Sequence, residues 1–324
     1  MRHLLLTSLF ACATLVLAAQ QTPQYSLYML NRFELNPAYA GLDDALSLTG
    51  ALRRQWVGLE GAPASQIGSA HLPVYLTGGG FGVQFSNETL GPLTSTLFTG
   101  AYNFQLPLGR SAILSLGVGG GILQQRLDGT ALRTPEGTYP NEPGGIFSHE
   151  DPFLSELAQN GNTPVFNAGA YLKTESLEVG VSSTQNLEPR FAAGPTELQL
   201  VRTYSAHVFY QWDLTRTLAL RPSAVVRSDA RQTQLEFSAL FEYNENIFGG
   251  ASFRGYTQSS RDAVVIIAGL RLNEQTTLAY AYDLTLSSLQ QVASGSHEIM
   301  IGYRLAQPIG KGRPPKIIYN PRQL

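Results

Sequence analysis

The stretch Thr276–Leu305, TTLAYAYDLTLSSLQQVASGSHEIMIGYRL, contains two segments in which apolar side chains alternate with small or polar ones. This period of two predicts two β-strands, each with one apolar face. The opposite face carries charged side chains at Asp283, Glu298 and Arg304. An apolar face backed by a charged one is typical of a strand that lies between lipid and a wet lumen. We therefore interpret this stretch as the closing hairpin of an outer-membrane β-barrel.

The same alternation recurs along most of the chain and predicts about 14 antiparallel strands, each near the length that a tilted membrane-spanning strand needs. The clearest is Thr233–Tyr243, where Phe237 and Phe241 share one face and Glu236 and Glu242 the other. We predict an all-β fold, a closed transmembrane barrel. The predicted strands are residues 45–57, 64–75, 80–87, 94–106, 112–125, 165–173, 177–184, 201–213, 218–227, 233–243, 247–256, 263–272, 277–284 and 298–305.

The lengths of the connections predict the orientation of this barrel. If the N-terminus lies in the periplasm, successive connections alternate between the inner and the outer side. The three longest, residues 126–164, 185–200 and 285–297, then all fall outside. The short turns fall inside, as they do in bacterial outer-membrane barrels. An even number of strands also returns the C-terminus to the periplasm.

The longest connection, residues 126–164, exceeds the length of a plain loop. Within it, Asp151 suits the N-cap of a helix and Pro152 its first position, and an Asn-Gly pair beginning at residue 160 suits its end. We expect a short helix over Asp151–Ala158. It acts either as a lid folded over the barrel, which we favour, or as a surface feature that binds a partner.

The two ends of the chain depart from the strand pattern. Residues 1–19 are a predicted signal peptide, and residues 20–43 lack any strand period. Within residues 20–43, Asn36-Pro37 favours a turn. We expect residues 20–43 to pack in the lumen as a plug, or else to contact a periplasmic partner. Residues 44–305 form the barrel, and residues 306–324 a basic, proline-rich tail. That tail is either solvated or, with equal weight, docks on a periplasmic protein or peptidoglycan through Lys311, Arg313, Lys316 and Arg322.

Composition narrows the possible functions. The formal net charge of −2 over 324 residues gives no reason to expect nucleic acid as a partner. The single cysteine, Cys12, lies in the signal peptide, so the mature chain has no disulfide and no thiolate metal site. No later segment approaches the roughly 18 apolar residues of a membrane helix. An exported chain with many alternating segments indicates the outer membrane.

No residue pattern supports catalysis, a cofactor or a metal. His149 has polar neighbours but no nucleophile elbow of a hydrolase accompanies it, so ordinary loop polarity is the favoured explanation. We interpret His297 and Glu298 as a structural hydrogen-bonding pair, because a metal would need further ligands. The run Gly117–Gly121 lacks the spacing of a nucleotide loop. It lies in a predicted strand, where small residues let a bulky neighbour or a plug approach.

Three stretches carry specific motifs. They are Gln24–Gly41, which contains NPAYAG, Arg53–Pro63, which contains RQWVG, and Tyr282–Asp283 together with Gly295–Met300. In these stretches the chain resembles the PorP/SprF family of outer-membrane proteins, which are associated with type IX secretion in Bacteroidota. Asp151–Phe153 and Phe166–Gly169 look similar as well. Arg32 departs from the family pattern, where a neutral residue is expected. We give a structural role and a partner-binding role equal weight for the motif residues. These residues are Tyr28, Asn31, Asn36, Pro37, Ala38, Tyr39, Gly41, Arg54, Gln55, Trp56, Gly58, Asp151, Pro152, His297 and Glu298.

The resemblance implies a non-enzymatic accessory of type IX secretion or gliding. Such proteins are associated with the export or surface anchoring of large adhesin-like proteins that carry a C-terminal secretion domain. We therefore expect a secreted protein of this kind at the outer face. At the inner face we expect periplasmic secretion or motility proteins, or a peptidoglycan-associated protein. The alternative is a passive porin for small solutes, and an enzyme is the weakest candidate because no nucleophile–base pair stands out.

Overall fold

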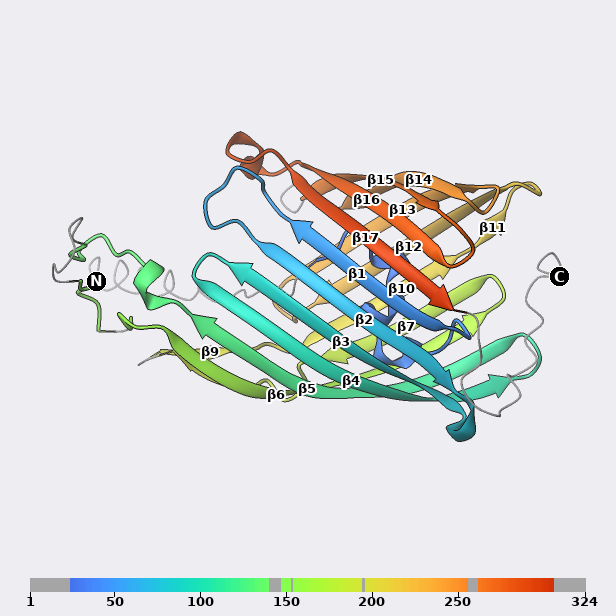
Figure 1. Ribbon diagram of the computed structural model, residues 1–324, viewed down its shortest axis with the longest axis horizontal. Coiled ribbons are helices and arrows are strands. Elements are labelled where there is room, and N and C mark those ends of the chain that lie inside the picture. The colour runs from blue at the N-terminus through green and yellow to red at the C-terminus, as the bar shows by residue number, and fades with distance from the viewer. Residues whose placement is uncertain (1–23, 140–146, 153, 194–195, 256–261, 306–324) are drawn as a thin grey trace, which may run out of the picture.

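The computed structural model describes residues 24–139, 147–152, 154–193, 196–255 and 262–305. Within these ranges the chain forms a closed antiparallel barrel of 14 strands, with β10 and β11 as two parts of one strand (Figure 1). The predicted fold class is confirmed. The strands are β1 (Leu46–Arg54), β2 (Ala64–Val74), β3 (Gly79–Leu90), β4 (Leu93–Leu108), β5 (Ala112–Leu127), β6 (Gln159–Thr174), β7 (Leu177–Thr184), β10 (Thr203–Tyr210), β11 (Trp212–Asp213), β12 (Leu218–Ser228), β13 (Thr233–Tyr243), β14 (Ile247–Arg254), β15 (Ala263–Arg271), β16 (Thr276–Thr285) and β17 (Ser296–Leu305).

The first and last strands close the barrel. β1 pairs with β17, with Leu46 opposite Leu305 and Arg54 opposite His297. On the other side of the barrel, β10 pairs with both β7 and β12. Each strand of the described barrel therefore has two hydrogen-bonded neighbours, so its backbone groups are satisfied where the barrel meets lipid. Among the described residues, no helix is long and apolar enough to cross a membrane.

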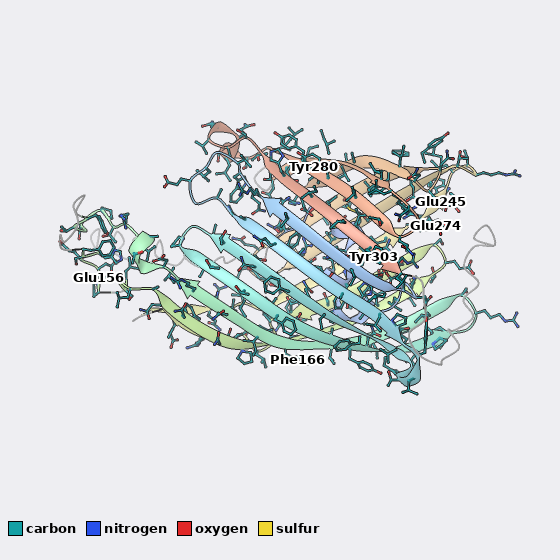
Figure 2. The ribbon with its side chains drawn as sticks, in the orientation of Figure 1. Glu156, Phe166, Glu245, Glu274, Tyr280 and Tyr303 are labelled. Carbon is teal, nitrogen blue, oxygen red and sulfur yellow. The ribbon has the colours of Figure 1, made fainter. Side chains whose placement is uncertain are left out.

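The side chains of each strand alternate between the lipid and the lumen. In β13, Phe237 is exposed on the outer surface, whereas the neighbouring Glu236 is buried inside. Figure 2 shows Phe166, Tyr280 and Tyr303 projecting from the outer surface of the wall. Apolar and aromatic side chains thus cover the face that meets hydrocarbon, as an outer-membrane barrel requires.

Long connections gather at one end of the barrel and short turns at the other. Glu156, in the long β5–β6 connection, marks the first end, and Glu245 and Glu274, in short turns, mark the second (Figure 2). β9 and the long connections lie at the left of Figure 1. This asymmetry agrees with the orientation predicted from the sequence, so the long-loop end is called the outer end below and the other the inner end.

The β5–β6 connection contains no helix where one was predicted. The described residues within Asp151–Ala158 form turns and bends, so that prediction is wrong. β6 begins at Gln159, which pairs with Leu127 of β5, and Gly161 pairs with Gln125. The Asn-Gly pair that was expected to end a helix therefore belongs to the barrel ladder, which leaves too few residues for a stable helix.

The remaining elements are short. β8 (Arg190–Ala193) and β9 (Thr196–Gln199) form a separate hairpin in the β7–β10 connection. Short 3₁₀ turns lie at the inner end, η3 (Tyr75–Thr77), and in the outer connections, η4 (Gly129–Ala131) and η6 (Ser288–Gln291).

Candidate functional site

Residues 24–44, here called the luminal segment, run through the interior of the barrel (Figure 1). The segment contains three short turns, η1 (Tyr28–Leu30), α2 (Arg32–Leu35) and η2 (Pro37–Tyr39). Pieces of three or four residues do not hold their shape alone. Contacts with the barrel therefore determine the path of the segment. Its buried apolar residues, which pack against inner-face residues of the strands, are Tyr25, Leu27, Tyr28, Met29, Phe33, Leu35, Ala38, Tyr39, Ala40 and Leu42.

Asn36 fixes the middle of the luminal segment to two strands. Its Oδ1 accepts a hydrogen bond from the backbone N–H of Ala38 at 2.9 Å, which caps η2, and Pro37 occupies the first position of that turn. Its Nδ2 donates to the carbonyl oxygens of Ala170 in β6 and Val181 in β7, both at 3.0 Å. The turn predicted at Asn36-Pro37 is confirmed. A single side chain thus joins the turn to the barrel wall.

Side chains of the barrel donate hydrogen bonds to the backbone carbonyl groups of Ala38 and Ala40, which follow Asn36 in the luminal segment. Asn103 in β4 donates from Nδ2 to the carbonyl oxygens of Ala38 at 2.9 Å and Ala40 at 2.7 Å. Its Oδ1 accepts from the backbone N–H of Gly80 at 2.8 Å. Ser115 in β5 also donates to the Ala38 oxygen, at 2.7 Å. Buried backbone groups need such partners, so the polar inner face replaces the secondary structure that the segment lacks.

Inward-facing glycines make room for this backbone. A Cβ atom added at Gly117 would lie 2.5 Å from the Cα of Ala38, and one at Gly80 would lie 1.9 Å from the carbonyl oxygen of Ala40. Neither distance is possible between real atoms, so only glycine fits. The expectation that small residues in the Gly117–Gly121 run allow a close approach is confirmed at Gly117.

A buried charge network holds the start of the luminal segment near the outer end. Arg53 in β1 forms ion pairs with Asp283 in β16 at 2.6 Å and Glu298 in β17 at 3.2 Å. Arg254 in β14 forms ion pairs with Asp283 at 3.2 Å and Glu236 at 2.9 Å. The charge network consists of these five residues and Ser26, all 5% exposed or less.

Ser26 connects the luminal segment to that network. Its backbone N–H donates to Glu298 at 2.6 Å, and its hydroxyl oxygen lies 2.8 Å from Asp283. The same oxygen accepts from Arg53 at 2.9 Å and Arg254 at 3.0 Å. Charged groups buried in this way are tolerated only when they are paired and hydrogen-bonded. The interior therefore provides a preformed polar socket for this one residue.

Arg32, where the resemblance led us to expect a neutral residue, is anchored within the lumen. Its guanidinium group forms an ion pair with Glu178 of β7 at 2.7 Å. It also lies over the ring of Phe209, 4.7 Å from the ring centroid. Arg32 therefore fixes the segment by charge and by a cation–π contact.

The luminal segment lies between two cavities. The inner vestibule, about 320 Å³, is lined by Arg32 and by inner-end residues such as Gln275. The outer vestibule, about 220 Å³, is lined by Glu34 of the segment and by outer-end residues such as Glu88 and Leu200. The two sides of the segment thus border different cavities.

The structure separates the predicted motif residues into two groups. Tyr28, Asn31, Asn36, Pro37, Ala38, Tyr39 and Gly41 all lie in the lumen. Outside the lumen, Arg54 ends β1, Gln55, Trp56 and Gly58 lie in the outer β1–β2 loop, and Asp151 and Pro152 lie in the β5–β6 connection. Lys311, Arg313, Lys316 and Arg322 lie outside the described residues.

The RQWVG loop extends the pairing of β1 and β17 beyond the strands. The backbone N–H of Val57 donates to the oxygen of Gly295 at 2.9 Å, and that of Ser294 donates to the oxygen of Val57 at 2.7 Å. Trp56 and Gly58 adopt positive φ angles of 46° and 99°. The backbone therefore turns sharply here, which explains the glycine.

His297 and Glu298 do not form a hydrogen-bonding pair, so that interpretation is wrong. Neighbouring residues of a strand point to opposite faces. The Nδ1 atom of His297 lies 2.6 Å from the hydroxyl of Tyr280 on the outer face. Glu298 is buried in the lumen and accepts from Ser26 and Leu27.

Sequence reasoning missed several of the residues that hold the segment. Arg54 is among the predicted motif residues and the adjacent Arg53 is not, although the alternation in β1 places only Arg53 inside the barrel. Arg254 and Asn103 belong to no motif. Each of them is a charged or amide side chain on the lumen face of an alternating strand. Many other positions share this feature, so it does not identify the residues that bind the segment.

The described residues offer no metal centre and no catalytic pair. They contain no group of three or more His, Cys, Asp or Glu side chains that could hold a metal ion. His149 is buried, with Nε2 2.9 Å from the oxygen of Gly129 and Nδ1 3.0 Å from the hydroxyl of Tyr139. It therefore stabilises the fold of its loop.

The chain is similar to several solved barrel proteins. The Acinetobacter baumannii outer-membrane protein Omp33 has a TM-score of 0.45 and 8% sequence identity, over 81% of this chain and 99% of that chain. A deletion mutant of TodX, a monoaromatic hydrocarbon channel, gives 0.47 and 8% over 88% and 95%. A Pseudomonas aeruginosa FadL homologue gives 0.41 and 13% over 80% and 89%. Among curated proteins there is no match.

One family model matches nearly the whole chain. It is described as "Type IX secretion system membrane protein PorP/SprF", and it matches residues 17–303. This range contains the luminal segment and almost all of the barrel, whose architecture places the protein in the outer membrane. The chain belongs to the PorP/SprF family of type IX secretion system membrane proteins.

Proposed function

We propose that the protein is a non-enzymatic scaffold of the type IX secretion system. At its outer face it binds a large adhesin-like protein with a C-terminal secretion domain, and supports its export or anchoring. At its inner face it contacts periplasmic secretion or motility proteins. Membership of the PorP/SprF family supports the role in secretion, and the two partners are the part that needs testing.

The observation that carries this proposal is the packing of the luminal segment. Tyr28 and Leu27 are fully buried in the same apolar cluster as Phe209 and Val265 of the wall. A porin, in contrast, keeps a polar, water-filled lumen. A lumen filled by a fixed segment supports a scaffold with two docking faces rather than a diffusion channel.

The inner face has the charged groups that a periplasmic partner needs. Arg221 and Arg271 both pair with Glu242 beside the inner vestibule. The basic side chains of Lys311, Arg313, Lys316 and Arg322 follow β17 in the sequence and belong to the same proposal. Complementary charges on the two proteins of such a contact guide their association and specify the partner.

The test is surface proteomics of a clean deletion strain against its parent and against a strain complemented in trans. Loss of one or a few large secreted proteins, with restoration on complementation, is the expected result. Loss of every protein with a C-terminal secretion domain would mark a core component of the machine rather than an accessory for one client. An unchanged surface would overturn the secretion proposal.

Single-channel recording distinguishes the scaffold from a porin. The native protein in a planar bilayer is expected to show no steady conductance. Deletion of residues 20–43, with the signal peptide retained, is expected to open the lumen. Steady conductance of the native protein, equal to that of the deletion variant, would instead support the porin.

A further inference from the structure

The outer vestibule contains polar atoms that the described residues leave unsatisfied. The hydroxyl of Tyr25 and the Oε1 atom of Gln125 are buried and have no hydrogen-bond partner, and the two residues are 4% and 2% exposed. The Oε2 atom of Glu34 is also buried and also has no hydrogen-bond partner. All three residues line the cavity. Because buried polar atoms normally have partners, these atoms mark a place where a ligand can bind.

The lining of the vestibule also has more acidic than basic side chains. The acidic residues are Glu34 from the luminal segment and Glu88 from β3. Arg227 is the one basic side chain in the lining, and its Nη2 atom has no hydrogen-bond partner. Neither carboxylate forms an ion pair with another described residue. Two carboxyl groups beside one guanidinium favour a cationic ligand, because a positive charge nearby stabilises their ionised form.

The walls between these polar groups are apolar. They consist of leucine and valine side chains from the outer ends of β3 to β6 and from the β7–β10 connection. A ligand that fits this lining has an apolar stem and a positively charged end with several hydrogen-bond donors. The lining side chains are Leu90, Leu93, Leu97, Leu123, Val165 and Leu200.

We propose that the outer vestibule binds an alkylammonium or alkylguanidinium group, with its charged end at Glu34 and Glu88 and its stem against the leucines. The hydroxyl of Tyr25 and the oxygen of Gln125 accept its remaining hydrogen bonds. Such a group occurs on free amines and on lysine or arginine side chains of a peptide. The vestibule lies at the outer end, which faces the cell surface in the orientation predicted from the sequence. This proposal does not depend on the secretion role.

The test uses the full-length barrel in detergent micelles and isothermal titration with three probes. These are n-pentylamine, its neutral counterpart 1-pentanol, and the blocked peptide acetyl-Gly-Lys-Gly-amide. Saturable binding of pentylamine with one site per barrel, weakened by salt, is expected, and pentanol is expected to bind at least tenfold more weakly. Tighter binding of the peptide than of the amine would identify a protein side chain as the ligand. The reverse order would identify a free amine.

Variants locate the site. Glu34→Gln and Glu88→Gln keep the shape of the side chain and remove one charge, so each is expected to weaken pentylamine binding at least tenfold. Glu60→Gln, on the exposed β1–β2 loop, is the matched control and is expected to change nothing. Retained heat-modifiable mobility on gels confirms that each variant is folded.

Several outcomes would overturn the proposal. They are the absence of saturable binding by both the amine and the peptide, equal binding of pentanol, and equal losses in Glu88→Gln and Glu60→Gln. Saturable binding of Ca²⁺ that is lost in the Glu34 and Glu88 variants would also overturn it, because the carboxylates would then form a metal site.

Discussion

Arg53 and Arg54 are neighbours in the chain but have opposite surroundings. The pleat of β1 turns Arg53 into the lumen, where it pairs with Asp283 and Glu298, and turns Arg54 to the exposed outer surface. Asp283 also pairs with Arg254, but Glu298 has no other ion-pair partner among the described residues, and breaking such a buried pair costs about 3–5 kcal/mol. An exposed arginine contributes little.

Arg53→Ala is therefore expected to destabilise the barrel by about 3–5 kcal/mol, whereas Arg54→Ala is expected to change stability by less than about 0.5 kcal/mol. Thermal unfolding in micelles, followed by heat-modifiable gel mobility, measures both under the same conditions. Equal midpoints for the two variants would show that the charge network does not hold the fold.

Gly117 and Gly100 form a second matched pair. A Cβ at Gly117 would collide with the backbone of Ala38, whereas one at Gly100 would meet no atom within 4 Å. Gly117→Ala is expected to displace the luminal segment, and so to raise the rate at which a maleimide labels a cysteine introduced at Met29. Gly100→Ala is expected to leave labelling unchanged. If labelling is slow in both, the segment does not depend on this close approach.

At the scale of single elements, the ring of Phe191 packs the β8–β9 hairpin against the barrel. Phe191 is 1% exposed, and a Cβ at Gly161 of β6 would lie 2.2 Å from its ring. This contact lies at the outer end of β6, where strands extend towards the loops. Phe191 therefore stabilises the hairpin rather than the barrel.

Phe191→Ala is expected to make the β7–β10 connection sensitive to protease added to intact cells, with no change in the thermal midpoint of the barrel. The reason is that local unfolding needs only the contacts that hold the element itself. Leu187→Ala, at a 56% exposed position in the same connection, is the control. A lowered midpoint in Phe191→Ala would show that the hairpin belongs to the cooperative core.

The elements also show where local sequence signals fail. Asp151-Pro152 is a helix-start signal by local chemistry, yet the ladder of β5 and β6 begins at Gln159 and includes the Asn-Gly pair that was expected to end the helix. Strand pairing between residues far apart in the chain thus overrides a local preference. By contrast, the turn at Asn36-Pro37 formed as predicted, because its cap and its proline act within three residues.

At the scale of the whole molecule, the barrel has two ends that lie in different compartments. Leu157, in the β5–β6 connection, is 71% exposed at the outer end, and Leu76, in the turn between β2 and β3, is 94% exposed at the inner end. The one natural cysteine, Cys12, lies in the predicted signal peptide. Cysteines introduced at these two positions therefore report orientation without interference.

A membrane-impermeant maleimide added to intact cells is expected to label Leu157→Cys and not Leu76→Cys. Permeabilised cells are expected to allow labelling of both, which controls for reactivity. Labelling of Leu76→Cys alone in intact cells would invert the orientation, and would move the outer vestibule and both docking faces to the opposite compartments.

The sequence by itself determined the barrel. Its alternation, its strand number and the unequal lengths of its connections are local properties, because lipid on one face and a polar lumen on the other impose a period of two on every strand. Only the tertiary structure decided what fills that barrel. The path of the luminal segment depends on Asn103, Ser115, Gly117 and Arg254, which are far from it in the chain. No period in the sequence records such contacts, because each joins one irregular backbone position to one side chain across a closed sheet.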